Sequence, residues 1–167
     1  MEIRLAFPNE VNQIMQVIEG AKKCLADAGS TQWQNGYPDA DTIIEDIISG
    51  QAYVALEEGE LLLAYAAVTK SPEKAYEAIY DGNWEGNEAE YLVFHRIAVA
   101  SDVQGQGVAQ TFLEGLIEGF DYLDFRSDTH AKNKAMQHIF EKLGFKQVGK
   151  VPVDGERLAY QKLKSNA

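Results

Sequence analysis

The segment from Tyr91 to Phe120 constrains the fold of this chain more than any other. It opens with a run of β-branched and aromatic residues that ends at Val99, which is typical of a buried strand. A short stretch of small and polar residues follows. Apolar residues then recur at helical spacing, at Val108, Phe112, Leu113, Leu116, Ile117 and Phe120. The segment therefore predicts a strand, a loop and a helix in direct succession.

The loop of this segment holds two glycines, Gly105 and Gly107, just before the predicted helix. Glycine allows tight turns and close approach of a ligand to the backbone, and the first N–H groups of a helix have no partner within it. The loop is therefore suited to an anion such as phosphate. Because the helix dipole alone contributes only about 0.3–1 kcal/mol, a diphosphate that engages several N–H groups is favoured. Similar turns also serve only to pack a helix on a strand, so both interpretations stay open.

The charge of the chain limits its partners. The sequence has 26 acidic and 15 basic residues, which give a formal charge of −11. Nucleic-acid binding needs a basic surface, and none is visible, so we expect no nucleic-acid partner. The negative charge keeps the protein in solution and favours a cationic acceptor such as an amine.

Length and hydropathy predict one cytoplasmic domain over residues 1–167. No apolar run approaches the roughly 20 residues of a membrane span, and the first residues lack the pattern of a signal peptide. We therefore expect no membrane contact. Cys24 is the single cysteine and lies on an apolar helical stripe, which favours a buried thiol over a nucleophile.

The remaining segments alternate between strands and helices. Hairpins are expected at Glu58-Gly59 and Asp154-Gly155, and Asp41 is expected to cap a helix that ends at Gly50. A long insertion follows the second hairpin strand, over residues 71–87, and insertions of this length are often functional. Further strands are predicted at 2–7, 51–57, 60–70, 122–126, 145–148 and 158–163, and helices at 9–28, 41–50 and 136–143.

This order of elements, together with two motifs, resembles the GNAT superfamily of acyl-CoA-dependent N-acetyltransferases over nearly the whole chain. The family's diphosphate motif is matched by Gln104-Gly105-Gln106-Gly107-Val108-Ala109, which follows Ile97-Ala98-Val99. A second match is Asn133, followed by a helix that ends in Gly144-Phe145. The resemblance implies an α/β (α+β) fold with a mixed, mostly antiparallel central sheet of about seven strands, flanked by helices. Its central strands would splay apart to hold acetyl-CoA.

The resemblance implies direct transfer of an acetyl group from acetyl-CoA, as cosubstrate, to a primary amine of a small molecule or peptide, without a metal. The backbone at Ile97 would polarise the thioester carbonyl, and Val99 would pair with the pantetheine as a strand does. Asn133 would bond the pantetheine or shape its groove. The full set of expected cofactor-binding residues is Ile97, Ala98, Val99, Gln104, Gly105, Gln106, Gly107, Val108, Ala109, Asn133 and Phe140.

The acceptor must lose a proton before it reacts, because an alkyl amine has a pKa near 10. His95 is the first candidate for the base, since it precedes Ile97 by two positions and is predicted to share its strand face. Asp128 and His130 are the second candidates. A structural histidine held by its neighbours is the alternative for His95. Arg96, of opposite strand parity, is expected to form a structural ion pair.

Two positions depart from the family pattern. Phe140 stands where many members carry a tyrosine that protonates the departing thiolate, and Val93 stands where some carry a catalytic glutamate. The acid therefore stays open between water, Ser127, Thr129, a tyrosine of the insertion, and no acid at all.

Aromatic residues in the two irregular stretches are the candidates for acceptor recognition. They could instead hold these loops on the core. As a set they suggest a small acceptor with an apolar part. These residues are Trp33, Tyr37, Tyr76, Tyr80 and Trp84.

Two other functions fit parts of the sequence. Gly105-Gln106-Gly107 begins a dinucleotide-binding fingerprint, but Gln110 occupies the place of its third glycine, which disfavours an oxidoreductase. A catalytically idle acyl-CoA-binding sensor or interaction domain would fit Phe140 and Val93. Turnover distinguishes it from an enzyme. Pairing of edge strands into a homodimer also stays open.

Overall fold

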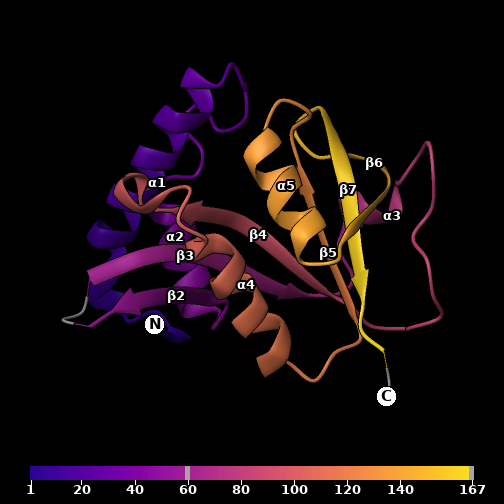
Figure 1. Cartoon of the computed structure of the whole chain (residues 1–167), viewed down its shortest axis with the longest axis horizontal. Coiled ribbons are helices and arrows are strands. Elements are labelled where there is room, and N and C mark those ends of the chain that lie inside the picture. Colours follow the sequence, from indigo (N-terminus) through magenta and orange to yellow (C-terminus); the bar gives the residue numbers. More distant parts are fainter. Residues whose placement is uncertain (59–60, 166–167) are drawn as a thin grey trace.

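The protein is one seven-stranded sheet with helices on both faces (Figure 1), seen in a computed structural model that describes residues 1–58 and 61–165. The strand order is β1-β2-β3-β4-β5-β7-β6, and every neighbouring pair is antiparallel except β4 and β5. The mixed, mostly antiparallel sheet predicted from the sequence is confirmed. The strands are β1 Glu2–Leu5, β2 Ala52–Glu57, β3 Leu61–Lys70, β4 Leu92–Val99, β5 Asp124–Thr129, β6 Lys146–Pro152 and β7 Glu156–Leu163.

The helices divide between the two faces of the sheet. On one face, Phe112 of α4 and Phe140 of α5 pack with Phe94 and Phe125 of the sheet. On the other face, α1 and α2 cover the strands of the N-terminal half, and α3 covers part of the C-terminal half. Each large side chain buried in this way contributes about 1.5–3 kcal/mol. The helices are α1 Val11–Asp27, α2 Ala40–Ile48, α3 Lys74–Glu77, α4 Val108–Gly119 and α5 Lys134–Lys142.

The described helices offer no membrane span, since none combines the length and the apolar character needed to cross a bilayer.

Both predicted hairpins are present, but one predicted helix cap is wrong. Glu57 pairs with Leu61 across the first turn, whose Gly59 lies outside the described residues. Pro152 pairs with Glu156 across the second turn. Helix α2 is capped by Asp39 instead of Asp41, because the Asp39 carboxylate accepts a hydrogen bond from the Thr42 amide at 2.9 Å.

The central strands β4 and β5 separate soon after they begin. They pair in parallel only through Leu92 with Phe125 and Val93 with Arg126. One further link crosses the gap, from the Ser127 hydroxyl to the Phe94 carbonyl at 2.8 Å. Beyond it, β4 continues to pair with β3 and β5 with β7. Each of the two strands therefore turns an edge toward a gap, as the predicted splaying requires.

A bulge in β4 changes the direction of its side chains. His95 pairs with Ala67 and Ala98 pairs with Tyr65, so β4 has one residue more than β3 between these pairs, and Arg96 has a φ of 53°. An inserted residue reverses the alternation of faces. Ile97 consequently packs in the cluster under α4, whereas the His95 ring lies beside the Tyr76 ring, which belongs to the cluster at α3. The prediction that His95 and Ile97 share a face is wrong.

The insertion between β3 and β4 is closed at its base by two hydrogen bonds. The Ser71 amide donates to the Tyr91 carbonyl at 2.9 Å, and the Tyr91 amide donates to the Ser71 hydroxyl at 3.1 Å. Further out, Tyr80 forms a two-way backbone bridge with Lys150 of β6. The insertion carries α3 and lies beside β6 and β7 at the right of Figure 1.

Substitution of Gly107 by alanine should lower the free energy of unfolding by about 1–2 kcal/mol, because this residue precedes α4 with a φ of 80°. Steric overlap is no factor, since an added Cβ would meet no atom within 4 Å. Gly119→Ala in α4 is the matched control, and it should raise stability by about 0.5–1 kcal/mol. Urea titration of both variants measures the difference. A stabilised Gly107→Ala protein would contradict the left-handed conformation.

Candidate active site

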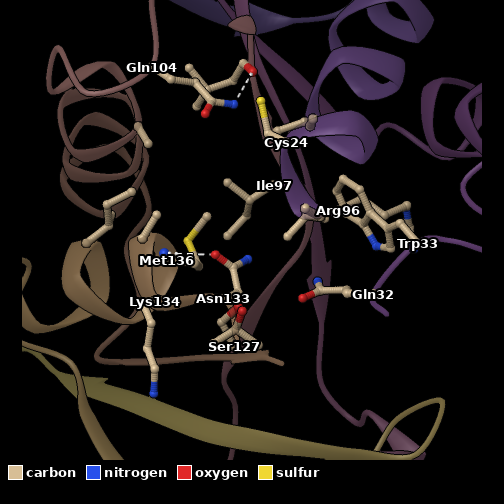
Figure 2. Close-up of a pocket in the computed structure, with 18 of the residues that line it drawn as sticks. Cys24, Gln32, Trp33, Arg96, Ile97, Gln104, Ser127, Asn133, Lys134 and Met136 are labelled. Atoms are coloured by element: carbon tan, nitrogen blue, oxygen red, sulfur yellow. Dashed lines mark hydrogen bonds between the residues drawn. The ribbon is translucent and has the colours of Figure 1, made fainter. Parts of the chain in front are cut away.

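A cavity of about 690 Å³ occupies the gap between β4 and β5 (Figure 2). Its walls come from α1 with the loop that follows it, and from the start of α4 together with α5. This volume lies within the range of about 300–1,000 Å³ that is usual for small-molecule sites. Cys24, expected to be buried, is half-buried and lines the wall formed by α1.

The glycine loop presents free backbone amides at one end of the cavity. The Thr111 amide is bonded to the Gly107 carbonyl at 3.0 Å. Before it, within the described chain, the amides of Gly105, Gly107, Val108 and Ala109 form no backbone hydrogen bond. An added Cβ at either glycine would meet no atom within 4 Å. The loop thus combines unpaired donors with open space, which fits an anionic group such as a diphosphate.

Most of the expected cofactor-binding residues line this cavity, and two do not. The Gln106 amide is bonded to the Val103 carbonyl at 3.3 Å, and its side chain reaches the Asp102 carbonyl at 3.4 Å. Phe140 is fully buried, with its ring 5.2 Å from that of Phe145. The residues that do line the cavity are Ile97, Ala98, Val99, Gln104, Gly105, Gly107, Val108, Ala109 and Asn133.

Asn133 has one side-chain group left for a ligand. Its Oδ1 caps α5 by accepting a hydrogen bond from the Met136 amide at 3.1 Å (Figure 2). Its Nδ2 group has no acceptor within the part of the chain that the structure describes, and the residue lines the cavity. Asn133 can therefore order the helix and donate to a bound molecule at the same time.

Three lysines that the sequence analysis did not single out also line the cavity, namely Lys132, Lys134 and Lys142. They lie on α5 and the loop before it, on the wall that faces α1. All three are exposed. In a chain with a formal charge of −11, they provide local positive charge for an anionic ligand. Their spacing in the sequence did not distinguish them from ordinary helix-surface residues.

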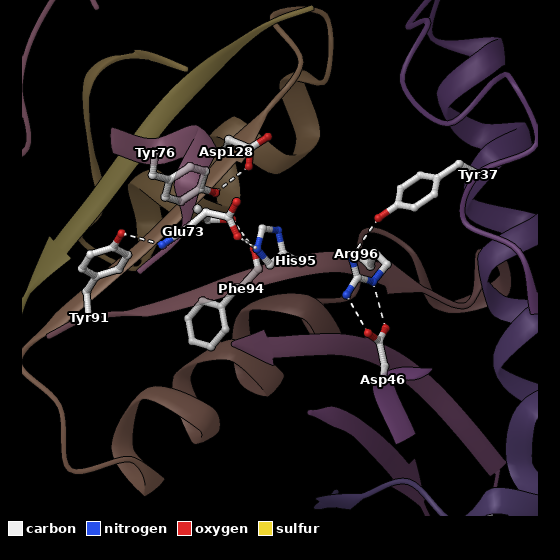
Figure 3. A network of polar contacts seen from close by, with 10 residues as sticks. Tyr37, Asp46, Glu73, Tyr76, Tyr91, Phe94, His95, Arg96 and Asp128 are labelled. Carbon is white, nitrogen blue, oxygen red and sulfur yellow. Dashed lines mark hydrogen bonds and ion pairs between the residues drawn. The ribbon is translucent and has the colours of Figure 1, made fainter. Parts of the chain in front are cut away.

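His95 is held by a carboxylate from the insertion (Figure 3). Its Nε2 lies 3.3 Å from Oε2 of Glu73, and the Glu73 amide donates to the Tyr91 hydroxyl at 2.9 Å. The hydrogen bond with His95 lowers the pKa of Glu73. Glu73 was missed in the sequence analysis, although it directly follows Pro72 at the N-cap of α3. The half-buried His95 lines the cavity. Glu73 can therefore hold the His95 ring in a fixed orientation, in which the ring can accept a proton.

Asp128 also lines the cavity and accepts a hydrogen bond from the Tyr76 hydroxyl at 2.5 Å (Figure 3). Burial raises the pKa of Asp128, and the hydrogen bond from Tyr76 opposes this rise. Tyr76 is fully buried, and its carbonyl accepts a hydrogen bond from Trp84 Nε1 at 2.7 Å. Tyr76 and Trp84 thus support the carboxylate from behind and do not line the cavity.

His130 and Tyr80 also lie outside the cavity lining. His130 joins the loop after β5 to the loop after α1, since its Nε2 lies 3.2 Å from the Thr31 hydroxyl and its amide donates to Gln32 Oε1 at 3.2 Å. Burial lowers the pKa of His130, as does the charge of Arg157. Tyr80 lies on the outer side of the insertion and bonds Glu156 at 3.0 Å.

Arg96 forms the structural ion pair predicted for it (Figure 3). Its guanidinium donates to both carboxylate oxygens of Asp46, at 2.8 and 2.6 Å, and to the Tyr37 hydroxyl at 2.8 Å. Asp46 also accepts a hydrogen bond from the buried Tyr65. This network fixes the bulge of β4 to α2 and positions Tyr37 at the cavity, where Trp33 also lies.

Two hydroxyl groups on β5 line the cavity. Ser127 donates to the Phe94 carbonyl. Thr129 Oγ1 is buried and has no hydrogen-bond partner among the described residues. Among these residues there is also no group of His, Cys, Asp and Glu side chains that could hold a metal ion.

Comparison with known proteins identifies the family. A family model described as an acetyltransferase (GNAT) domain matches residues 49–147. The chain belongs to the GNAT acetyltransferase family. A GNAT family acetyltransferase from Streptococcus agalactiae is 54% identical, with a TM-score of 0.95 over 99% of this chain and 96% of that one. A search of curated proteins found no significant match.

Two more distant acetyltransferase structures share the fold. A putative acetyltransferase from Staphylococcus aureus is 26% identical, with a TM-score of 0.72 over 98% of this chain and 99% of that one. The PaiA N-acetyltransferase from Thermoplasma acidophilum, solved in complex with coenzyme A, is 14% identical. Its TM-score is 0.70 over 97% of this chain and 98% of that one, which shows the fold alone.

Replacement of Tyr76 by phenylalanine should raise the pKa of Asp128 further, because the lost hydrogen bond stabilises the charged carboxylate. Carbon-13 NMR titration of the aspartate carboxyl groups measures this pKa directly. Tyr80→Phe is the control, since its hydroxyl bonds Glu156 and should leave Asp128 unchanged. An unchanged or lowered Asp128 pKa in Tyr76→Phe would contradict the assignment of the donor.

Proposed function

We propose that this GNAT protein is an N-acetyltransferase that moves an acetyl group from acetyl-CoA directly to a primary amine. The observation that carries the proposal is the set of free amides at Gly105, Gly107, Val108 and Ala109, at the end of a cavity between parted strands. The coenzyme A complex of the similarly folded PaiA protein supports it. The acceptor is a small molecule or peptide, and residues 1–167 act as one domain.

The cavity offers separate groups for each part of the cosubstrate. The amides of the glycine loop bind the diphosphate, and Lys132, Lys134 and Lys142 supply positive charge for the phosphate groups. Asn133 Nδ2 donates to the pantetheine, which runs along the edge that β4 turns toward the gap at Ala98 and Val99.

The reaction needs position and charge from the protein more than covalent chemistry. The amine nitrogen bonds to the acetyl carbon, the carbon–sulfur bond breaks, and the thiolate leaves. The backbone N–H of Ile97 stabilises the charge that develops on the carbonyl oxygen. The amine's proton goes to His95, which Glu73 holds in place. Asp128 is the second candidate for this role.

The acceptor side of the cavity attracts an ammonium group before it reacts. Glu73 and Asp128 are both half-buried near His95, and each contributes negative charge. Neighbouring groups of one charge raise the local concentration of an oppositely charged substrate beside them. Trp33 and Tyr37 add apolar surface on the opposite wall. These features together favour an amine with an apolar part.

An acyl-CoA sensor without turnover is the second candidate function. It is favoured by Phe140, which lies in the core and offers no proton to a departing thiolate. Both functions require acetyl-CoA binding, and only the enzyme releases free thiol when an amine is added.

Gly107→Glu should abolish acetyl-CoA binding, because a carboxylate side chain would fill the open space before the free amides and repel phosphate. Calorimetric titration of wild type and variant with acetyl-CoA measures this. Gly119→Glu, at the exposed far end of α4, is the matched control and should bind normally. Normal affinity in Gly107→Glu would remove the diphosphate assignment. Thiol release with a panel of amines then separates enzyme from sensor.

His95→Ala should lower turnover by about 100-fold or more, the usual contribution of a general base. The loss should be greatest at low pH, where removal of the amine proton limits the rate, and acetyl-CoA affinity should change little. Thiol release measured across pH tests this. Turnover that matches wild type at every pH would exclude His95 as the base. The pH profiles of thiol release by Asp128→Asn and His130→Ala would then rank the remaining candidates.

A further inference from the structure

A buried arginine lines the cavity on the side of Asp128. Arg157 lies on β7, is only 6% exposed, and reaches the cavity together with Val153 and Asp154. Since Asp128 pairs with Ala159, Arg157 is a diagonal cross-strand neighbour of Asp128 on the same face of the sheet. Burial raises the pKa of Asp128, and the charge of Arg157 is among the influences that oppose this rise. Arg157 therefore belongs to the acceptor side of the site.

The guanidinium of Arg157 differs from those of the half-buried Arg96 and the buried Arg126. Arg96 and Arg126 each bind a buried carboxylate through two nitrogens, Arg96 at 2.8 and 2.6 Å and Arg126 at 3.2 and 2.9 Å. Arg157 Nη1 donates to the Glu156 carbonyl at 3.3 Å, and Nη2 lies 3.7 Å from the exposed Asp154. These are its only polar contacts within the described residues.

A guanidinium has five N–H donors and stays charged. A buried charge is costly unless it is paired and hydrogen-bonded. Arg157 has neither a short ion pair nor a full set of acceptors within the described chain, yet it lines a cavity that opens to a ligand. A planar, anionic group of the ligand would satisfy it, and a carboxylate fits the fork of the guanidinium through two parallel hydrogen bonds.

We propose that Arg157 binds a carboxylate of the acceptor, so that the acceptor is a small zwitterionic amine of the amino-acid type. This inference rests on the proposed function. The carboxylates of Glu73 and Asp128 face the ammonium end beside His95, and Arg157 faces the carboxylate end. The negative groups of the site then face the ammonium group of the substrate, and the positive guanidinium faces its carboxylate. A simple cationic amine would leave Arg157, within the described residues, with only its contacts to the Glu156 carbonyl and Asp154. An acid without an amine could not react.

The test compares each standard amino acid with its own carboxamide, which keeps the amine and removes the negative charge. Wild type should show a higher kcat/KM for the carboxylate member of the best pair. Arg157→Met should raise the KM for that amino acid by about 10–100-fold, the usual effect of a lost charged hydrogen bond, and change the KM for the carboxamide little. The KM of Arg157→Lys for the amino acid should lie between those of wild type and Arg157→Met, because lysine keeps the charge but cannot form two parallel hydrogen bonds.

Lys150→Met is the matched control, since it removes one positive charge from the neighbouring strand β6. Among residues 1–58 and 61–165, the Lys150 side chain pairs only with Asp81 and Glu156. It should behave as wild type. Calorimetric titration should show that acetyl-CoA affinity is unchanged in Arg157→Met. A loss of that affinity would assign Arg157 to the cosubstrate and overturn the inference. If Arg157→Met does not fold, the wild-type comparison and Arg157→Lys still decide.

The outcomes separate this inference from the function on which it rests. No acetyl-CoA binding, or no thiol release with any amine, would overturn the transferase and the inference together. Thiol release with carboxamides or simple amines that equals or exceeds release with amino acids would overturn the inference and leave the transferase standing. If Arg157→Met raises the KM equally for an amino acid and for its carboxamide, the inference is also overturned and the transferase still stands.

Discussion

The central constraint on this protein is that β4 and β5 must separate without dividing the sheet. The two strands share two residue pairs and one side-chain link from Ser127 to Phe94. What keeps them in one sheet is the packing on the face of α4 and α5, where the rings of Phe94 and Phe125 stack with centroids 5.9 Å apart. Because an apolar cluster does not require the strands to pair, the backbone beyond it is available to a ligand.

A second feature of the region where β4 and β5 separate is the bulge at Arg96. It turns Ile97 toward the α4 side and leaves His95 on the α3 side, so that groups from both faces of the sheet meet at one cavity. The left-handed backbone of Arg96 is held by its bidentate pair with Asp46. Removing one partner of a buried pair of this kind usually costs several kcal/mol. The network thus supports the bulge of β4 and also joins α2 to the sheet.

The sequence predicted the parts of the site that depend on local conformation. The glycine loop and the helix after it are short-range features, and each has a residue signature. The cap at Asn133 is also a short-range feature, but Asn133 was expected only as a cofactor-binding residue. The mixed, mostly antiparallel sheet and the GNAT fold followed from the resemblance, which rested on the order of elements and two motifs. The residues that came from distant segments were not predicted. Glu73, Arg157 and the three lysines take their place in the cavity through strand pairing and helix packing, which a single sequence does not display.

The aromatic residues of the irregular segments show the same limit on prediction from a single sequence. Five were expected at the acceptor cleft, and only Trp33 and Tyr37 line it. In the sequence of a polar, irregular segment, a tyrosine that will be buried cannot be distinguished from one that will be exposed. The difference depends on which other segments pack against the side chain. Tyr76 became a support for Asp128 because the insertion folds back on β5. The roles assigned to His95, Asp128 and the cosubstrate residues remain predictions.

The closed base of the insertion has a consequence for how such proteins diversify. Ser71 and Tyr91 hold its two ends together where β3 passes into β4, so the segment between them leaves and rejoins the sheet at adjacent strands. Its length and composition can change without altering the pairing of β3 with β4. Glu73 and Tyr76 lie within it, whereas the glycine loop lies outside it. The insertion can therefore vary in evolution while the glycine loop is inherited intact.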